Sequence, residues 1–168
     1  MFTKMSADFL LEGVIISLTN DIMPELQSQR AQVVVAMMQG ILQTVRQRLP
    51  VEQQIMAAEH NEMTAMYREV AAILGDATGG AAGRVRERAA ALGARDDMAP
   101  VPAFEAITGP YHELSEGIIS SLFDLDELIR DGDERGEKAL LRVRRYLGPR
   151  YTRDYGTMVA AAGMVGRG

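Results

Sequence analysis

Apolar residues recur at intervals of three and four along most of the chain, which is the spacing of one face of an α-helix. The strongest example lies between Pro24 and Pro50. Proline lacks the amide proton and disfavours helical geometry in the residue before it, so these two prolines bound a helix over residues 26–49. Its apolar positions, expected to face the core, are Leu26, Val33, Val34, Met37, Met38, Ile41, Leu42, Val45 and Leu49.

The remaining segments repeat this pattern, and no strand-like alternation of useful length interrupts it. We therefore predict an all-α fold, an antiparallel helical bundle of four main helices with short accessory helices packed around them. The main helices are expected at 6–21, 26–49, 51–74 and 110–130. The accessory helices are expected at 84–92, 103–108 and 134–147, with Pro110 opening the last main helix and Gly148-Pro149 ending the chain's final helix.

Length and composition indicate one folded domain. The chain has 168 residues, of which 47% are hydrophobic and 24% are charged, as in an average soluble protein. We predict a single bundle domain over residues 1–155 and a flexible Gly/Ala-rich C-terminal tail over 156–168, which frays or docks on a partner chain.

Composition also removes several function classes. The absence of cysteine excludes thiol nucleophiles, disulfides and cysteine-based metal sites, and only two histidines, His60 and His112, are present. A net charge of −5 makes nucleic acid an unlikely partner. No apolar run is long enough to cross a bilayer and Glu12 interrupts the apolar N-terminal stretch, so we expect a cytoplasmic protein without membrane contact.

One group of polar residues lies on an apolar helical face. At 100° per residue, Glu59 falls among Ile55, Met63 and Val70, with His60 and Glu62 at the edges of that face. One interpretation is a buried general base or ligand site made by Glu59, His60 and Glu62; the other is that this stretch extends beyond the core or finds an arginine. The Glu-x-x-His spacing of di-iron bundles is missing at both histidines, so we predict no metal and no cofactor.

Charges separate into two consecutive blocks. Residues 113–134 contain eight acidic side chains and one arginine, whereas residues 135–153 contain seven basic side chains and one glutamate. One interpretation is an anion-binding surface for phosphate or nucleotide, for which Arg142, Arg144, Arg145 and Arg150 are the candidates. The other is that the two helices face each other with complementary charge.

Methionine is abundant, with eleven residues, and five lie on predicted helical stripes: Met37, Met38, Met56, Met63 and Met66. Methionine fills irregular core space and also forms adaptable partner surfaces. We expect most of them in the core.

The stretch Leu10-Leu-Glu-Gly-Val, the Met23-Pro-Glu-Leu turn with the helix after it, and Gly148-Pro-Arg-Tyr151 resemble an uncharacterised bacterial all-helical family. Members of that family are often encoded beside aminoglycoside-phosphotransferase-like kinases and acyl-CoA dehydrogenases. The resemblance therefore implies a helical fold and suggests a phosphotransferase-like kinase or an acyl-CoA dehydrogenase as partner. It brings no activity with it.

These observations favour a small non-catalytic helical accessory or protein-interaction module that forms homo-oligomers. Two alternatives stay open: a ligand- or metal-binding helical enzyme that uses Glu59, His60 and Glu62, and phosphate or nucleotide binding through residues 142–153.

Overall fold

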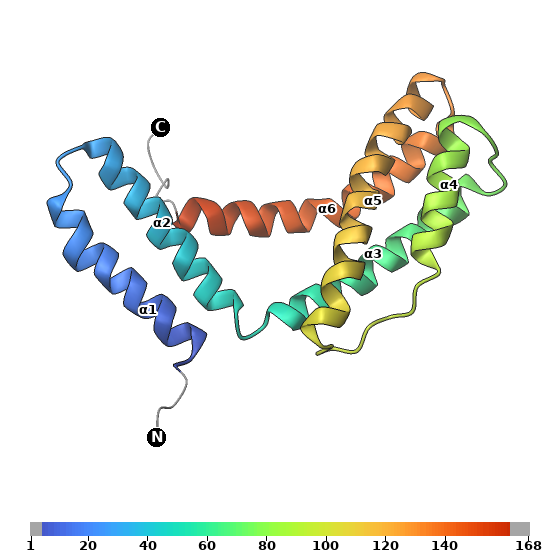
Figure 1. Ribbon diagram of the computed structural model, residues 1–168. Helices are drawn as coiled ribbons and strands as arrows, with labels where there is room; N and C mark the ends of the chain where they lie inside the picture. Colours follow the sequence, from blue (N-terminus) through green and yellow to red (C-terminus); the bar gives the residue numbers. More distant parts are fainter. Residues whose placement is uncertain (1–4, 162–168) are drawn as a thin grey trace. The chain divides into compact units, whose positions relative to one another are not determined.

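The computed structural model describes the backbone of residues 5–161 and the side chains of residues 5–152, and every element in this range is helical (Figure 1). The all-α prediction is confirmed. The α-helices are α1 (Ala7–Ser17), α2 (Gln29–Arg48), α3 (Glu52–Leu74), α4 (Gly80–Gly93), α5 (Phe104–Arg130) and α6 (Glu134–Ala161), and the short turns η1 (Leu18–Ile22, a π-helix) and η2 (Met23–Glu25, a 3₁₀-helix) join α1 to α2.

The chain forms two compact units, which are described separately. The first comprises residues 1–52 and 151–168, and the second comprises residues 53–150. The expectation of a single domain over residues 1–155 stays a prediction.

The main hydrophobic core belongs to the second unit and is built by α3, α4, α5 and the first part of α6. Alanines on α4 allow that helix to approach closely, while larger side chains on α3 and α5 fill the space between. Its least exposed members are Met63, Met66, Tyr67, Val70 and Leu74 on α3, Val85 and Ala89 on α4, Leu114 and Leu125 on α5, and Ala139 and Val143 on α6.

This core uses a different set of helices from the one predicted. Two helices expected to be accessory, α4 and α6, contribute to it, and none of its members comes from α1 or α2. The four-helix bundle is therefore not confirmed in the predicted detail. Residues 80–83, which precede the accessory helix expected at 84–92, form the first turn of α4, where Ala81, Ala82 and Gly83 are buried.

Two prolines expected at helix boundaries lie inside helices. The structure has one helix, α5, across the predicted break at Pro110, and α6 continues through Gly148-Pro149 to Ala161. A proline removes one backbone hydrogen bond, and packing on both sides can offset that loss. Ile107 and Leu114, on either side of Pro110, are fully buried. Residues 156–161 of the predicted tail are thus helical, and residues 162–168 lie outside the described residues.

In the first unit, α1 and α2 form a hairpin joined by η1 and η2 (Figure 1). Ser6 and Ser28 cap the two helices, since each side-chain oxygen accepts a backbone N–H three residues on. α1 ends at Ser17, and η1 continues the helical path from Leu18 to Ile22 with π-helical geometry. The predicted end of this helix at Asp21 therefore lies within η1. Two side chains of α2 connect the halves of the hairpin. Arg46 donates a hydrogen bond to Asp8 at 2.5 Å, and Gln39 donates one to the Thr19 hydroxyl at 2.8 Å.

Gly117 on α5 provides a test of core packing. Tyr67 donates a hydrogen bond to the Leu114 carbonyl at 2.8 Å, and a methyl group at Gly117 would lie 2.6 Å from the Tyr67 Oη and 2.5 Å from Leu92 Cδ1. We expect Gly117→Ala to lower the free energy of unfolding by about 1–3 kcal/mol, because Tyr67 has no space to move. The exposed Ser120→Ala variant of the same helix should change it by less than about 0.5 kcal/mol. Urea denaturation measures both, and equal stabilities would contradict the packing.

Candidate functional site

Glu59 is a buried carboxylate on α3. It lies on the face of that helix that enters the core, and only 5% of the residue is exposed. The helical-wheel placement is therefore correct, and the alternative that this stretch extends beyond the core is wrong. His60 is also buried, whereas the Glu62 side chain is 63% exposed.

Arg150 and Tyr111 are the partners of Glu59. The Tyr111 hydroxyl donates a hydrogen bond to Glu59 Oε2 at 2.5 Å, and Arg150 Nε lies 3.5 Å from Glu59 Oε1. Arg150 also pairs with Glu62 and stacks on the Tyr146 ring, 3.7 Å from its centroid. We call this set of five residues, with Arg150 at its centre, the Arg150 cluster; it connects α3, α5 and α6.

The electrostatics of the Arg150 cluster are those of a buried ion pair. Within these five residues, one guanidinium pairs with two carboxylates. Burial raises the pKa of the Tyr146 phenol, and the nearby Arg150 charge offsets only part of that rise. Because a buried carboxylate is stabilised by its cationic partner and hydrogen bonds, the arrangement accounts for Glu59 without a catalytic role.

His60 has a different environment from the two glutamates. Its Nδ1 lies 3.1 Å from the Asn61 side-chain oxygen, and Asn61 makes hydrogen bonds to both the N–H and the carbonyl of Met98. Among the side chains that the structure describes, no three histidine, aspartate or glutamate residues meet in a geometry that holds a metal ion. Glu59, His60 and Glu62 therefore do not form a common metal site.

The basic residues of α6 bind carboxylates of α3. Arg142 forms two hydrogen bonds with Glu69, at 2.5 and 2.9 Å, and these hold the pKa of Glu69 below its usual range. Arg150 is engaged by the cluster, while Arg144 and Arg145 are exposed on the same helix. Two of the four candidate anion ligands are thus already neutralised by protein carboxylates.

The acidic residues of α5 bind arginines of α4. Asp124 accepts hydrogen bonds from Arg84 at 2.8 Å and Arg88 at 2.9 Å, and Glu127 accepts one from Arg84. Burial acts to raise the pKa of Asp124, but these hydrogen bonds outweigh it and lower the pKa. Among the described residues, Asp124 and Glu127 thus find their counter-charges on α4, whereas the acidic and basic blocks pair where they adjoin, Arg135 with Asp133 and Lys138 with Glu134. Wider pairing of α5 with α6 stays a prediction.

The most unusual surface lies on the α1–α2 hairpin. Among its described residues only Val35 is buried, and seven of the nine residues of the apolar stripe predicted to be core are exposed, while Leu26 and Leu42 are half-buried. Gln39 and Arg46 point toward α1, which turns the more apolar side of α2 away from it. We call the exposed large apolar side chains of the hairpin the hairpin surface: Met5, Phe9, Leu10, Val14, Ile16, Ile22, Val33, Val34, Met37, Met38, Ile41, Val45 and Leu49.

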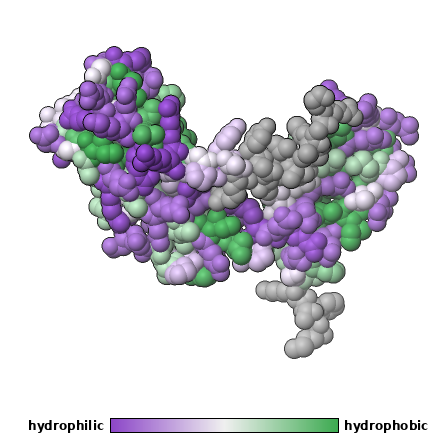
Figure 2. Space-filling model, turned by 180° about the vertical axis from the view of Figure 1, so that it is seen from behind, coloured by the Kyte–Doolittle hydropathy of each residue, from purple (hydrophilic) through white to green (hydrophobic). Residues whose placement is uncertain are grey.

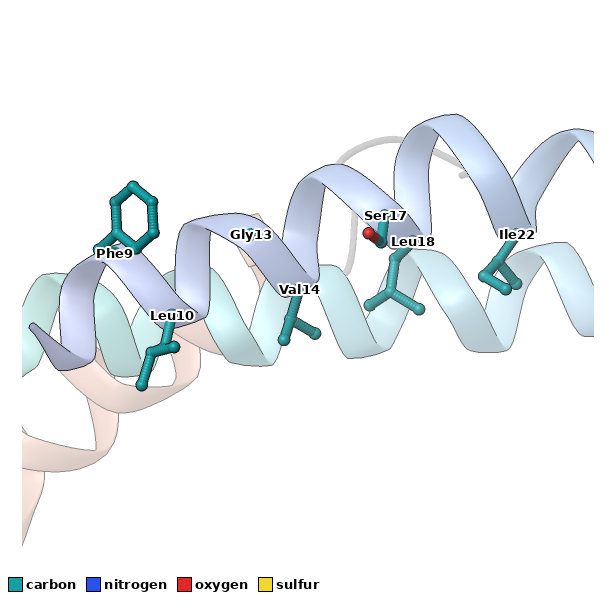
Figure 3. Close-up of a pocket in the computed structure, with 7 residues that line it drawn as sticks. All are labelled: Phe9, Leu10, Gly13, Val14, Ser17, Leu18 and Ile22. Atoms are coloured by element: carbon teal, nitrogen blue, oxygen red, sulfur yellow. The ribbon is translucent and has the colours of Figure 1, made fainter. Parts of the chain in front are cut away.

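The hairpin surface contains a groove. Figure 3 shows Leu10, Val14, Leu18 and Ile22 pointing to the same side of α1 and η1, at intervals of four residues. The groove has a volume of about 350 Å³, and its lining includes Gly13, which has no side chain, and the small Ser17. Figure 2 shows hydrophobic residues at the molecular surface on the part of the chain that contains α1 and α2.

Charged residues of the hairpin are largely paired with one another. Arg46 binds both Asp8 and Glu12, and Arg48 binds Glu52 at 2.9 Å. The Arg46 hydrogen bond lowers the pKa of Asp8, which keeps that carboxylate ionised. The hairpin therefore presents apolar side chains without requiring a charged ligand. None of the described helices is both long and apolar enough to span a membrane.

Replacement of Glu59 tests the buried ion pair. We expect Glu59→Gln to lower the free energy of unfolding by about 2–4 kcal/mol, because the buried Arg150 charge loses its closest buried counter-ion. Glu62→Gln removes the same charge from an exposed position and should cost less than about 1 kcal/mol. Chemical denaturation of both variants checks this, and similar small losses would show that Glu59 is solvated.

Two buried tyrosines make stability sensitive to alkaline pH. Burial raises the pKa of Tyr67 and Tyr146 above the ordinary value of 10.0, so the fold favours the protonated phenols. Their contribution is complete below pH 10, the ordinary pKa that they have in the unfolded chain, and is lost as pH rises toward their folded values. We expect ultraviolet titration of the folded chain to show two late-ionising tyrosines and the urea-unfolded chain to show none. Identical titration curves would contradict the burial.

Comparisons with known proteins identify no relative of this chain. No protein-family model, curated protein or solved structure matches the chain.

Proposed function

We propose that this chain is a non-catalytic helical interaction module, and that the α1–α2 hairpin binds a protein that presents an apolar helical surface. The observation that carries this proposal is the exposure of the hairpin surface. Ile41, for example, lies in the middle of α2 and is 61% exposed. Apolar residues placed at helical spacing and left in water are typical of a surface that a partner covers.

The size of the hairpin surface supports a protein partner. Its thirteen large apolar side chains are about half exposed on average. Summed over the faces of α1, η1 and α2, they expose on the order of 1,000 Å² of apolar surface. A standard protein interface covers about 800 Å² on each side. The hairpin surface is thus large enough for a specific complex.

Charge favours a protein over a lipid surface or a nucleic acid. Residues 5–49 contain four acidic and three basic side chains, a net charge of −1. Helices that lie on membranes usually have a lysine- and arginine-rich polar face, and nucleic-acid surfaces need clustered positive charge. The polar side chains of α2 include instead several glutamines, among them Gln29, Gln32, Gln43 and Gln47.

The other two hypotheses have less support. Glu59 and Glu62 are engaged by Arg150, and Arg142 is engaged by Glu69, so most of the residues proposed for ligand or phosphate binding already have protein partners. Arg144 and Arg145 are exposed on α6. The kinase and dehydrogenase partners suggested by the family resemblance stay predictions, as does a cytoplasmic location.

Methionine oxidation tests the proposal. Met37 and Met38 belong to the hairpin surface, while the buried Met63 and Met66 provide internal references. In cells that produce the chain, we expect hydrogen peroxide to oxidise Met37 and Met38 several-fold more slowly than the same residues in a short peptide, because a partner covers them. Peptide mass spectrometry measures the rates. Oxidation as fast as in the peptide would overturn the proposed function.

A further inference from the structure

We infer that the partner of the hairpin surface is a second copy of this chain, so that two α1–α2 hairpins pack together into a four-helix interface. This inference rests on the proposed function and names its partner. Two antiparallel helices with an exposed apolar side are half of a helical bundle, and a symmetric dimer supplies the other half with helices of matching length and spacing.

The spacing of the exposed residues suits helix-on-helix packing. Val34, Met38, Ile41, Val45 and Leu49 follow one another at intervals of three and four and form a continuous stripe along α2. On α1 and η1, the groove lined by Leu10, Val14, Leu18 and Ile22 runs beside Gly13 and Ser17. Side chains from a facing helix fit into such spaces between apolar ridges. A second hairpin brings both the stripe and the groove.

The small amount of burial within the hairpin indicates that its partner stays bound. Val35, 8% exposed, is the single buried residue of the described hairpin. Isolated helices of this length are marginal in water, and most helical stability in proteins comes from packing of an apolar side. A hairpin with so little core of its own needs a partner from the time it folds. Another copy of the chain meets that need in a fixed ratio.

Area and charge also favour self-association. Covering most of two hairpin surfaces would bury roughly 1,500–2,000 Å² in total, within the range of about 1,200–2,000 Å² for specific stable interfaces. Because Arg46 is paired with Asp8 and Glu12, and Arg48 with Glu52, two copies can approach without a concentrated charge of one sign. A strongly charged partner would gain little from this surface.

The mass of the purified full chain tests the inference. By light scattering coupled to size exclusion, we expect twice the chain mass of 18.4 kDa at micromolar concentration. Ile41→Glu should give the monomer mass, because it places a carboxylate in the interface. Gln43→Glu adds the same charge at an exposed polar position of α2 and should leave the dimer intact. The milder Ile41→Ala, which is compatible with a folded hairpin, should weaken dimerisation about tenfold or more.

Each outcome separates this inference from the proposed function. A wild-type chain that remains monomeric, or a dimer insensitive to both Ile41 variants, overturns the second copy as the partner. If Met37 and Met38 are nevertheless protected in cells, the interaction module stands with a different partner. If they are unprotected in cells, both proposals fail.

Discussion

Removal of apolar side chains from water is the constraint on which this structure depends, and the two units meet it differently. In residues 53–150, α3 is covered by α4, α5 and the first part of α6, and Met63, Met66 and Leu74 are almost completely buried. The hairpin of α1 and α2 has an equally apolar sequence but covers little of it. The same physical force therefore produces a closed core in one unit and an open surface in the other.

Polar contacts determine how the helices of the closed core are aligned. Arg150 places a charge against Glu59 at one end of the α3–α6 contact, and Arg142 binds Glu69 further along the same pair of helices. The two contacts are separated by about three turns on α3 and about two turns on α6, so together they define how α6 lies along α3. Buried ion pairs add little net stability compared with apolar packing, but a wrong alignment would leave a charge buried without its partner. We interpret the Arg150 cluster as a device that selects one packing arrangement.

Sequence periodicity predicted the helices well and their packing less well. The bounds of α3 and the place of Glu59 on its apolar face followed from spacing, because a 3.6-residue repeat fixes which residues share a face. Spacing left open whether that face is covered, and the structure shows that Glu59 is buried. Pro110 and Pro149 misled the prediction, since the packing that holds a helix across a proline comes from distant residues. The partner of Glu59 was missed for the same reason. Arg150 lies 91 residues further along the chain and was recognised only as part of a basic block.

The exposed stripe on α2 shows that periodicity alone does not identify what an apolar helix face packs against. A helix with Val34, Met38, Ile41 and Val45 on one side has the same pattern whether that side meets its own chain or another one. What distinguishes the two cases is whether the rest of the chain has apolar surface left to cover it. In the second unit the residues of the shared core bury one another, and the large apolar side chains left exposed there, such as Ile119, Phe123 and Leu141, are fewer than those of the hairpin surface. An apolar stripe without a counterpart in its own hairpin is explained by a counterpart on a second molecule.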